Sequence, residues 1–473
     1  MTGGFSWGLG VETEPKGIRA AFDGLVIQLF KLINLLAEKV HHKEFLVSFP
    51  IIRVLFGVGG GVRLDRVKIG VVGLGGIFRI AHLPAYTEVE EAQLAALCDI
   101  SEDALKRAER NVKRLYKDRA ERAEKDGRPD LAERLRRDLE GISVYKDLEE
   151  MLSKENLDLI DVCTPTKFHG PVAIEALRAG VNVMVEKPMA RTYLECLDVI
   201  EAVKESGRLY QHNENWLYSP IWYTLKKIVE SGVIGEPQYV LVSQAHGGPE
   251  WAAWFWDLDI AGGGALLDNG VHAITISWFL AGFEMEPKVV KAAEPQGIRV
   301  RMKTRILQGM FRPFEVEDDA HILIRYEDEE GRWVTALVEG SWSNRDLMND
   351  RVVGTDGEIE HVTKEGESIL KIKKPEGTVR EINLGRVPWT GSFIGEVRNM
   401  CNCVLNGVKP LCDERVGAET TAIVQTAYLS QKLGRKPVTL EEFKSYAEKI
   451  REREGERAPE VLLKDLISGV ART

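Results

Sequence analysis

Cysteine is scarce in this 473-residue chain, and its scarcity bounds what the protein can be. The six cysteines are too few and too scattered to form a disulfide framework, which is typical of proteins that work in a reducing cytoplasm. Cys401, Cys403 and Cys412 lie close together in the sequence. No histidine is near them, and their spacing matches no familiar zinc pattern. We therefore expect buried helical thiols here and no metal site.

Long apolar runs and an excess of basic residues are also missing. No run reaches the roughly 18–20 apolar residues of a membrane span, and no signal-peptide pattern opens the chain. The 63 Lys and Arg residues are outnumbered by 73 Asp and Glu residues, giving a net charge of −10. This balance argues against nucleic acid or an anionic membrane surface as the main partner. The composition thus predicts a cytoplasmic protein whose main partner is neither nucleic acid nor an anionic membrane surface.

Residues 1–65 differ in pattern from the rest of the chain. Apolar residues recur at helical spacing from Phe22 to Val40 and predict an amphipathic helix. Gly59, Gly60 and Gly61 then predict a flexible joint. Three interpretations stay open for this N-terminal helical extension. It packs on the body or on a partner subunit, it lies on a membrane surface, or it is an artefact of a start codon placed too far upstream.

Strands and helices alternate through residues 66–212, as in the βαβ units of a parallel sheet. The first strand, 67–72, runs into a glycine-rich turn and a helix start, where backbone N–H groups suit a pyrophosphate. Asp99 ends the next strand, close to the spacing expected of a carboxylate that bonds the adenosine ribose. Because Asp99 would repel a 2′-phosphate, NAD is favoured over NADP. The alternative is that Asp99 only caps the helix that follows.

Two further regions complete the predicted organisation. A heavily charged insertion at about 101–141 predicts a lengthened helix and a helical hairpin on the rim of the first domain. Residues 213–440 contain strands separated by polar turns, as in antiparallel sheets. A capping box at Thr439 opens a charged helical tail over 441–473. The predicted fold class is α/β: an N-terminal Rossmann dinucleotide-binding domain and a C-terminal α/β domain with a mostly antiparallel open sheet.

A buried strand, 181–185, ends in Glu186, Lys187 and Pro188. A lysine at the carboxyl end of a parallel strand points into the crevice where open α/β sheets bind ligands. Since buried lysines are rare and usually paired, two interpretations compete. Either Lys187 is aimed at a substrate oxygen, or it belongs to an ion pair that caps the strand at the rim of the sheet.

Asp268 and His272 form a second candidate site. They follow three glycines, 262–264, and stand four residues apart in a run of helical length, so their side chains should converge. A carboxylate that orients an imidazole suits it to move protons, although a lone helical histidine is more often structural. Three tryptophans in the preceding loop would form an apolar wall for a sugar ring or nicotinamide; they are Trp251, Trp254 and Trp256.

Together these motifs resemble the glucose–fructose oxidoreductase, inositol dehydrogenase and rhizopine catabolism (Gfo/Idh/MocA) family over about residues 65–435. The combination of Glu-Lys-Pro with the glycine-rich Asp/His helix is far more specific than any single motif. The matching segments are Val72–Ile77 with His82–Pro84, Cys98–Asp99, Thr164–Pro165 with His169, Glu186–Pro188, and Gly262–His272.

The resemblance implies oxidation of a secondary alcohol of a sugar or cyclitol, with hydride transfer to nicotinamide. It assigns catalysis to Lys187, Asp268 and His272. His272 would take the hydroxyl proton, Asp268 would orient it, and Lys187 would stabilise the negative charge that develops on the oxygen. It also implies homo-oligomers built through the C-terminal sheet. The predicted cofactor-binding residues are Gly73, Gly75, Gly76, Ile77, Phe78, Asp99, Thr164, Pro165, His169, Glu186 and Lys187. The predicted substrate-binding residues are Lys187, Asn215, Trp256, Asp268 and His272.

Three positions depart from the family pattern. Phe78 replaces a small residue of the nucleotide turn, Thr275 stands where many members carry an acid, and Asn215 lies near the place of a common arginine. The last two leave the substrate open. Two other functions also stay open: an NAD-dependent glycosidase of the same fold, and a non-catalytic nucleotide-sensing regulatory protein. The intact set of Lys187, Asp268 and His272 argues against the sensor.

Overall fold

The computed structural model describes residues 66–293, 297–302, 304–343 and 348–472. The helical extension predicted over residues 1–65 lies outside the described residues. No helix of the described residues is long and apolar enough to cross a membrane.

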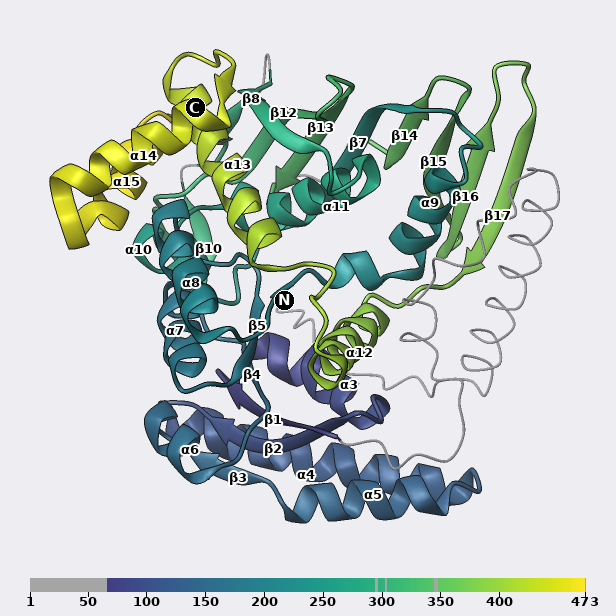
Figure 1. The fold of residues 1–473 in the computed structure, drawn as a ribbon, viewed down its shortest axis with the longest axis vertical. Coiled ribbons are helices and arrows are strands. Elements are labelled where there is room, and N and C mark those ends of the chain that lie inside the picture. Colours follow the sequence, from purple (N-terminus) through teal and green to yellow (C-terminus); the bar gives the residue numbers. More distant parts are fainter. Residues whose placement is uncertain (1–65, 294–296, 303, 344–347, 473) are drawn as a thin grey trace, which may run out of the picture. The chain divides into compact units, whose positions relative to one another are not determined.

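A six-stranded parallel sheet forms the first half of the described chain, with strand order β3-β2-β1-β4-β5-β6 (Figure 1). Its central strands are almost wholly buried, which explains their continuous apolar runs. This order is that of a doubly wound nucleotide-binding sheet, so the predicted Rossmann domain is confirmed. Its elements are β1 (Val67–Val72), α3 (Leu83–Glu88), β2 (Ala92–Cys98), α4 (Glu102–Lys125), α5 (Pro129–Glu140), β3 (Ser143–Tyr145), α6 (Leu148–Lys154), β4 (Leu159–Val162), α7 (His169–Arg178), β5 (Asn182–Glu186), α8 (Tyr193–Ser206) and β6 (Tyr210–Asn213).

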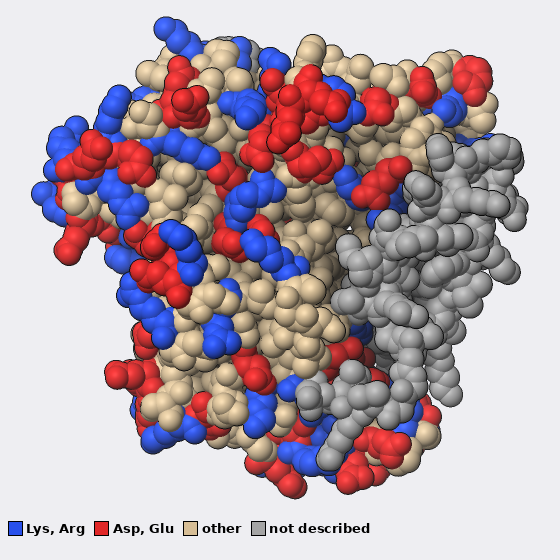
Figure 2. Space-filling model, viewed as in Figure 1, with Lys and Arg blue, Asp and Glu red and all other residues tan. Residues whose placement is uncertain are grey.

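The charged insertion forms two helices, α4 and α5. Ser101 caps α4 by accepting a hydrogen bond from the backbone N–H of Ala104, and Pro129 begins α5. Asp138 of α5 holds Arg66 beside β1, at 2.6 Å between Nη1 and Oδ1. The apolar sides of both helices join the core of the parallel sheet. Lys/Arg and Asp/Glu are interspersed on the face of the molecule drawn in Figure 2.

An eleven-stranded sheet forms the second half, and its pairing is antiparallel except for two parallel pairs, β7 with β13 and β9 with β19. Helices α9, α11 and α13 lie against one of its faces (Figure 1). The predicted mostly antiparallel domain is therefore confirmed. Its strands are β7 (Pro237–Ala245), β8 (Glu286–Ala292), β9 (Ile298–Val300), β12 (Asp319–Glu327), β13 (Trp333–Ser341), β14 (Arg351–Gly354), β15 (Gly357–Lys364), β16 (Glu367–Lys373), β17 (Val379–Gly385), β18 (Val438–Thr439) and β19 (Ala471–Arg472). The other elements are α9 (Pro220–Glu230), α10 (Leu258–Ala261), α11 (Val271–Ala281), the hairpin β10 (Arg305–Leu307) and β11 (Met310–Arg312), α12 (Gly391–Asn406), α13 (Glu414–Lys432), α14 (Leu440–Glu454) and α15 (Ala458–Ile467).

Two C-terminal segments return to the first domain. Helix α12 buries Phe393, Val397 and Met400 in the same apolar cluster as β1 and β2, so this part of the predicted 213–440 domain packs on the parallel sheet. The tail has two helices, and it is fastened to α8 and the loop before it by an ion pair between Arg451 and Asp198 and another, at 3.2 Å, between Arg191 and Glu460. Two segments from the C-terminal part of the chain, α12 and the tail, thus pack on the predicted first domain.

The six cysteines are buried and unpaired; burial was predicted for Cys401, Cys403 and Cys412, and the predicted helical position is wrong for Cys412 alone. Cys401 and Cys403 lie in α12, whereas Cys412 precedes α13. Burial raises the pKa of the Cys403 thiol to about 12, so this thiol stays protonated. These cysteines act as small apolar groups of the core.

Because α12 packs on the parallel sheet, Met400→Ala should destabilise the first domain. Met400 is fully buried between α12 and the parallel sheet, and a cavity of this kind costs about 2–4 kcal/mol of unfolding free energy. Val408→Ala, at a position 45% exposed just beyond α12, should cost less than about 0.5 kcal/mol. Urea unfolding followed by tryptophan fluorescence measures both. Equal effects of the two substitutions would contradict this packing.

Candidate active site

The glycine-rich turn after β1 has the shape that a dinucleotide phosphate needs. Gly73 has a φ of +90°, and a Cβ there would come within 2.7 Å of the backbone of Cys163 and Thr164. Gly75 and Gly76 are exposed, and a Cβ on either would meet nothing within 4 Å. The helix that follows begins at Gly76, and the first N–H groups of a helix have no partner within it. These groups fit a pyrophosphate.

Phe78 does not alter the surface of this turn. Its ring is fully buried in the core beneath the parallel sheet, so only its backbone can face a cofactor. Ile77 is partly buried against the same core. The first departure from the family pattern is therefore a packing feature, and the prediction that both residues bind the cofactor can apply only to their backbone groups or, for Ile77, to part of the side chain.

Asp99 ties the glycine-rich turn to the end of β2. Its Oδ2 accepts the backbone N–H of Leu74 at 2.9 Å, and its Oδ1 accepts that of Ser101 at 2.8 Å. Ser101 itself caps α4, so Asp99 is not the helix cap of the alternative interpretation. A carboxylate has about four acceptor positions, and Asp99 is only partly buried. It can still accept hydrogen bonds from ribose hydroxyls.

His169 links the loops that follow β4 and β5. Its Nε2 lies 2.8 Å from the carbonyl oxygen of Thr164, and its Nδ1 lies 2.7 Å from that of Pro188. Burial lowers the pKa of this imidazole. Thr164 Oγ1 is buried without a partner among the described residues, and Pro165 begins the short helical turn that leads to His169. His169 thus holds the Thr164-Pro165 loop against the Glu-Lys-Pro turn.

Lys187 and Asp268 form an ion pair between the two domains. Lys187 Nζ lies 2.5 Å from Asp268 Oδ1 and 3.0 Å from the Asp268 carbonyl oxygen. Burial alone would lower the pKa of Lys187, but the Asp268 carboxylate raises it above its ordinary value. Burial would likewise raise the pKa of Asp268, and Lys187 lowers it instead. Both groups are therefore charged, and the second Asp268 oxygen accepts the indole N–H of Trp342 at 2.9 Å.

The prediction that Asp268 orients His272 is wrong. His272 Nδ1 lies 2.7 Å from Glu214 Oε1, whereas both Asp268 oxygens have other partners. The reason is local: Asp268 lies in a π-helical turn, Leu266–Gly270, that precedes α11. The wider turn of a π-helix removes the i, i+4 alignment of an α-helix. Asp268 therefore turns to Lys187, and His272 turns to Glu214.

Glu214 is a candidate site residue that the sequence analysis missed. It follows β6 directly and is fully buried. The argument that singled out Lys187, a charged residue at the carboxyl end of a parallel strand, applies equally to Glu214. Because its carboxylate accepts from Nδ1 of His272, the other ring nitrogen, Nε2, is left to accept a proton.

Asn215 and Trp256 do not line this site. Asn215 is buried, and its amide donates to Ser392 Oγ at 2.7 Å. Trp256 is 3% exposed, and its ring packs 4.6 Å from that of Trp342, centroid to centroid. Trp256 therefore lies behind Trp342 and supports the indole that bonds Asp268. Of the three loop tryptophans, Trp251 is the most exposed, at 72%.

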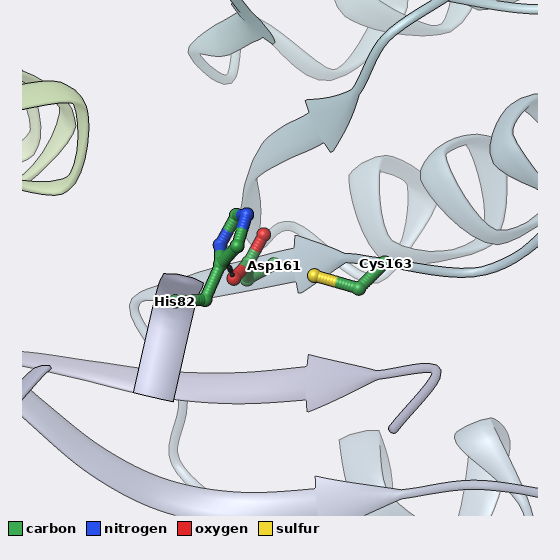
Figure 3. Close-up of side chains that lie close together, drawn as sticks. All are labelled: His82, Asp161 and Cys163. Carbon is green, nitrogen blue, oxygen red and sulfur yellow. Dashed lines mark hydrogen bonds and ion pairs between the residues drawn. The ribbon is translucent and has the colours of Figure 1, made fainter. Parts of the chain in front are cut away.

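Glu186 faces away from the crevice, into a buried charge cluster. His82 Nε2 lies 2.8 Å from Glu186 Oε1. On the other side of the ring, His82 Nδ1 lies 2.7 Å from Asp161 Oδ2, and Figure 3 shows this contact with Cys163 nearby. Tyr86 also donates to Asp161. A carboxylate only accepts, so both ring nitrogens carry protons and His82 is an imidazolium. Its pKa is raised well above 6.5 by Asp161, although burial lowers it. The predicted cofactor contact of Glu186 is thus replaced by a contact with His82.

Glu317 fixes the glycine segment that leads to Asp268. Its buried carboxylate accepts from the backbone N–H groups of Gly264, at 3.0 Å, and Leu266, at 2.9 Å, and from the hydroxyl of Tyr428 at 2.7 Å. A Cβ on Gly264 would come within 1.8 Å of the Glu317 carbonyl oxygen. Only glycine allows this approach. Burial raises the pKa of Glu317 to about 7, against hydrogen bonds that lower it.

Two family models match the two halves of this site. The model described as an oxidoreductase family with an NAD-binding Rossmann fold covers residues 67–214, and the GFO/IDH/MocA C-terminal domain covers 222–360. The chain belongs to the GFO/IDH/MocA oxidoreductase family. Its parallel-sheet domain is accordingly an NAD-binding domain, which confirms the predicted cofactor and the predicted class of enzyme.

Curated relatives and solved structures agree with this assignment. The chain is 25% identical over 393 residues to D-apiose dehydrogenase of Paraburkholderia graminis, covering 79% of this chain and 89% of that protein. It is 27% identical to D-glucoside 3-dehydrogenase of Escherichia coli, covering 46% of this chain but only 54% of that relative. Levoglucosan dehydrogenase, solved with NADH and levoglucosan, shares the fold with a TM-score of 0.64 at 19% identity, over 80% of this chain and all of that one.

Glu317 predicts a pH dependence of stability that Glu317→Gln removes. Between pH 4.5 and about 7, the folded protein keeps a proton that the unfolded chain has released, so stability falls as the pH rises through this window. The unfolding free energy of the wild type, relative to Glu317→Gln, should fall by about 2–3 kcal/mol from pH 5 to pH 8. Urea unfolding at both pH values measures it. A difference that does not change with pH would contradict the buried carboxyl.

Proposed function

We propose that this member of the family oxidises a secondary alcohol of a sugar or polyol and passes the hydride to NAD. The observation that carries the proposal is the pair of contacts Lys187–Asp268 and His272–Glu214, at 2.5 and 2.7 Å. They place a fixed ammonium and an oriented imidazole at the carboxyl ends of β5 and β6, where doubly wound sheets bind ligands.

His272 acts as the base. With Nδ1 donating to Glu214, Nε2 takes the proton of the substrate hydroxyl as the carbonyl double bond forms. The buried carboxylate of Glu214 stabilises the imidazolium that results. NAD, when bound, supplies the acceptor of the hydride that leaves the same carbon. One C–H bond and one O–H bond break, one C=O bond forms, and the released proton stays on His272.

Lys187 stabilises the reacting oxygen. Its ammonium is held by Asp268 and is not lost near neutral pH, because the carboxylate keeps its pKa above the ordinary value. It can therefore donate to the alkoxide-like oxygen throughout the reaction. Asp268 positions Lys187 through one carboxylate oxygen. Its other oxygen is fixed by the indole N–H of Trp342. We thus assign Asp268 a different role from the one predicted, as the partner of the lysine.

Two observations support a sugar as the substrate class. The relatives named above are dehydrogenases of apiose and of glucosides. Thr275, which takes the place of an acid in many members, is fully buried and donates to the carbonyl oxygen of Val271 at 2.9 Å. That position therefore offers the substrate no charge here, which favours a neutral sugar or polyol.

A glycosidase that uses NAD for transient oxidation is the second candidate. It is favoured by a 29% identical match over 174 residues to a glycosyl hydrolase family 109 protein of Shewanella baltica, covering 37% of this chain and 34% of that one. The same base and lysine would start such a reaction. Release of an aryl group without net NADH would identify this activity.

We further propose that the protein is a cytoplasmic homo-oligomer built through the large sheet. Tyr239 of β7 and Trp333 of β13 are 53% and 59% exposed, on the face of the sheet opposite the buried side chains of these strands. Exposed aromatic residues on an open sheet face are typical of interfaces. The six buried, unpaired thiols suit a reducing compartment.

The proposal is tested by NADH formation in a screen of sugars, inositols and sugar acids, with NAD and NADP in parallel. Lys187→Ala should lower kcat by on the order of 10²–10³ on the best substrate, because the developing charge loses its stabilising cation. Lys204→Ala, which removes a lysine 76% exposed on α8, is the matched control and should retain full activity. Full turnover by Lys187→Ala, or no reduction of either nucleotide by any compound, would contradict the proposal.

A further inference from the structure

The loop that follows β7 presents a half-buried histidine and an exposed tryptophan beside the site. His246 has a side chain 41% exposed, and its ring centroid lies 6.4 Å from that of Trp251, which is 72% exposed. His246 Nε2 lies 3.9 Å from Asp268 Oδ2. The rings of His246 and Trp251 therefore follow one another from the ion pair of Lys187 and Asp268 toward the solvent.

This loop is fastened at several points. Arg305, itself buried, donates to the carbonyl oxygen of Gly247 at 3.1 Å and to Glu250 Oε1 at 3.2 Å. The backbone N–H of Gln308 donates to the Glu250 carbonyl oxygen at 3.1 Å, and Trp256 donates to that of Pro249 at 3.3 Å. A loop held in this way keeps Trp251 in the solvent instead of letting it collapse onto the surface.

His246 is held in one orientation. The backbone N–H of Gly248 donates to its Nδ1 at 2.8 Å, so in the neutral ring the proton sits on Nε2. Its Nε2 faces the Asp268 carboxylate at 3.9 Å, and burial keeps the pKa of His246 below its ordinary value. Both ring nitrogens thus face protein groups, at Gly248 and Asp268, and the part of the ring left exposed is a C–H edge, which suits the apolar face of a sugar better than a charged group.

Side-chain exposure increases stepwise along this path. Lys187 is 17% exposed, and Asp268 and His272 are 12% exposed, whereas His246 reaches 41% and Trp251 72%. The site is enclosed around Lys187 and His272 and open around Trp251. This shape matches a ligand of two sugar units, one of which enters the enclosed end while the other stays at the open end. Aromatic rings combined with a few placed polar groups are the usual lining of ligand sites.

We propose that His246 and Trp251 form an outer subsite for the second sugar unit of a disaccharide or glycoside whose first unit is oxidised at Lys187 and His272. The apolar C–H face of that sugar ring stacks on the indole of Trp251, beside the ring of His246. The inference rests on the proposed function, and it narrows the substrate class from sugars in general to glycosides with a second ring.

The test compares one-ring and two-ring substrates in steady-state kinetics. A set of disaccharides and the methyl glycosides of the same first unit are assayed with NAD. In the wild type, kcat/KM should be higher for the disaccharide. Trp251→Ala should raise KM for the disaccharide about 5- to 10-fold and leave kcat, and the KM of the methyl glycoside, unchanged. Trp251→Phe should restore most of the loss, since it keeps an aromatic face.

Phe311→Ala is the matched control, because Phe311 is an exposed aromatic residue, at 78%, on the neighbouring strand β11. It should not discriminate between the two substrates. If Trp251→Ala changes both substrates alike, or changes only the oligomeric state, the subsite is refuted while the proposed function stands. If neither substrate reduces NAD in the wild type and other sugars do, the subsite is likewise refuted. If no sugar does, the proposed function itself fails.

Discussion

The ion pair between Lys187 and Asp268 is the constraint on which the site depends. It joins the end of a strand of the parallel sheet to the π-helical turn of the second domain, at 2.5 Å between Nζ and Oδ1. Both partners are mostly buried, so removing either would leave an unpaired charge, which is far more costly than losing a surface pair. The same contact keeps the lysine charged and links the two domains at the carboxyl end of β5.

A second buried charge lies directly behind the lysine. The His82 imidazolium bridges Asp161 of β4 and Glu186 of β5, so the residue before Lys187 is fixed from the core side of the sheet. Glu396 of α12 lies close to His82 and Glu186, and burial raises its pKa well above the ordinary value. The helix that returns to the first domain therefore adds a neutral carboxyl to this cluster, and the Glu-Lys-Pro turn is held on both sides.

The sequence predicted the parallel sheet and the helical hairpin from the alternation of strands and helices. It singled out Lys187 as a charged residue at a strand end, and Asp268 and His272 by their helical spacing after three glycines. It did not predict that the carboxylate of Asp268 pairs with Lys187 and that of Glu214 with His272. The i, i+4 rule holds for an α-helix, and Asp268 lies in a π-helical turn. Glu214, Trp342 and Glu317 come from distant segments of the chain, so only the packed structure brings them to the site. The burial of Trp256 and Glu186 is likewise a result of tertiary packing.

The central claim is that Glu214, and not Asp268, sets the tautomer of His272. It is tested most directly by kcat of Glu214→Gln on the best sugar substrate. An amide at this position can donate to Nδ1 and so leave the proton on Nε2, where the base must be free; kcat should fall by roughly 10²–10⁴ with little change in KM. Glu396→Gln, which replaces a neutral buried carboxyl, should stay close to the wild type. A Glu214→Gln enzyme that keeps the wild-type kcat would contradict the account.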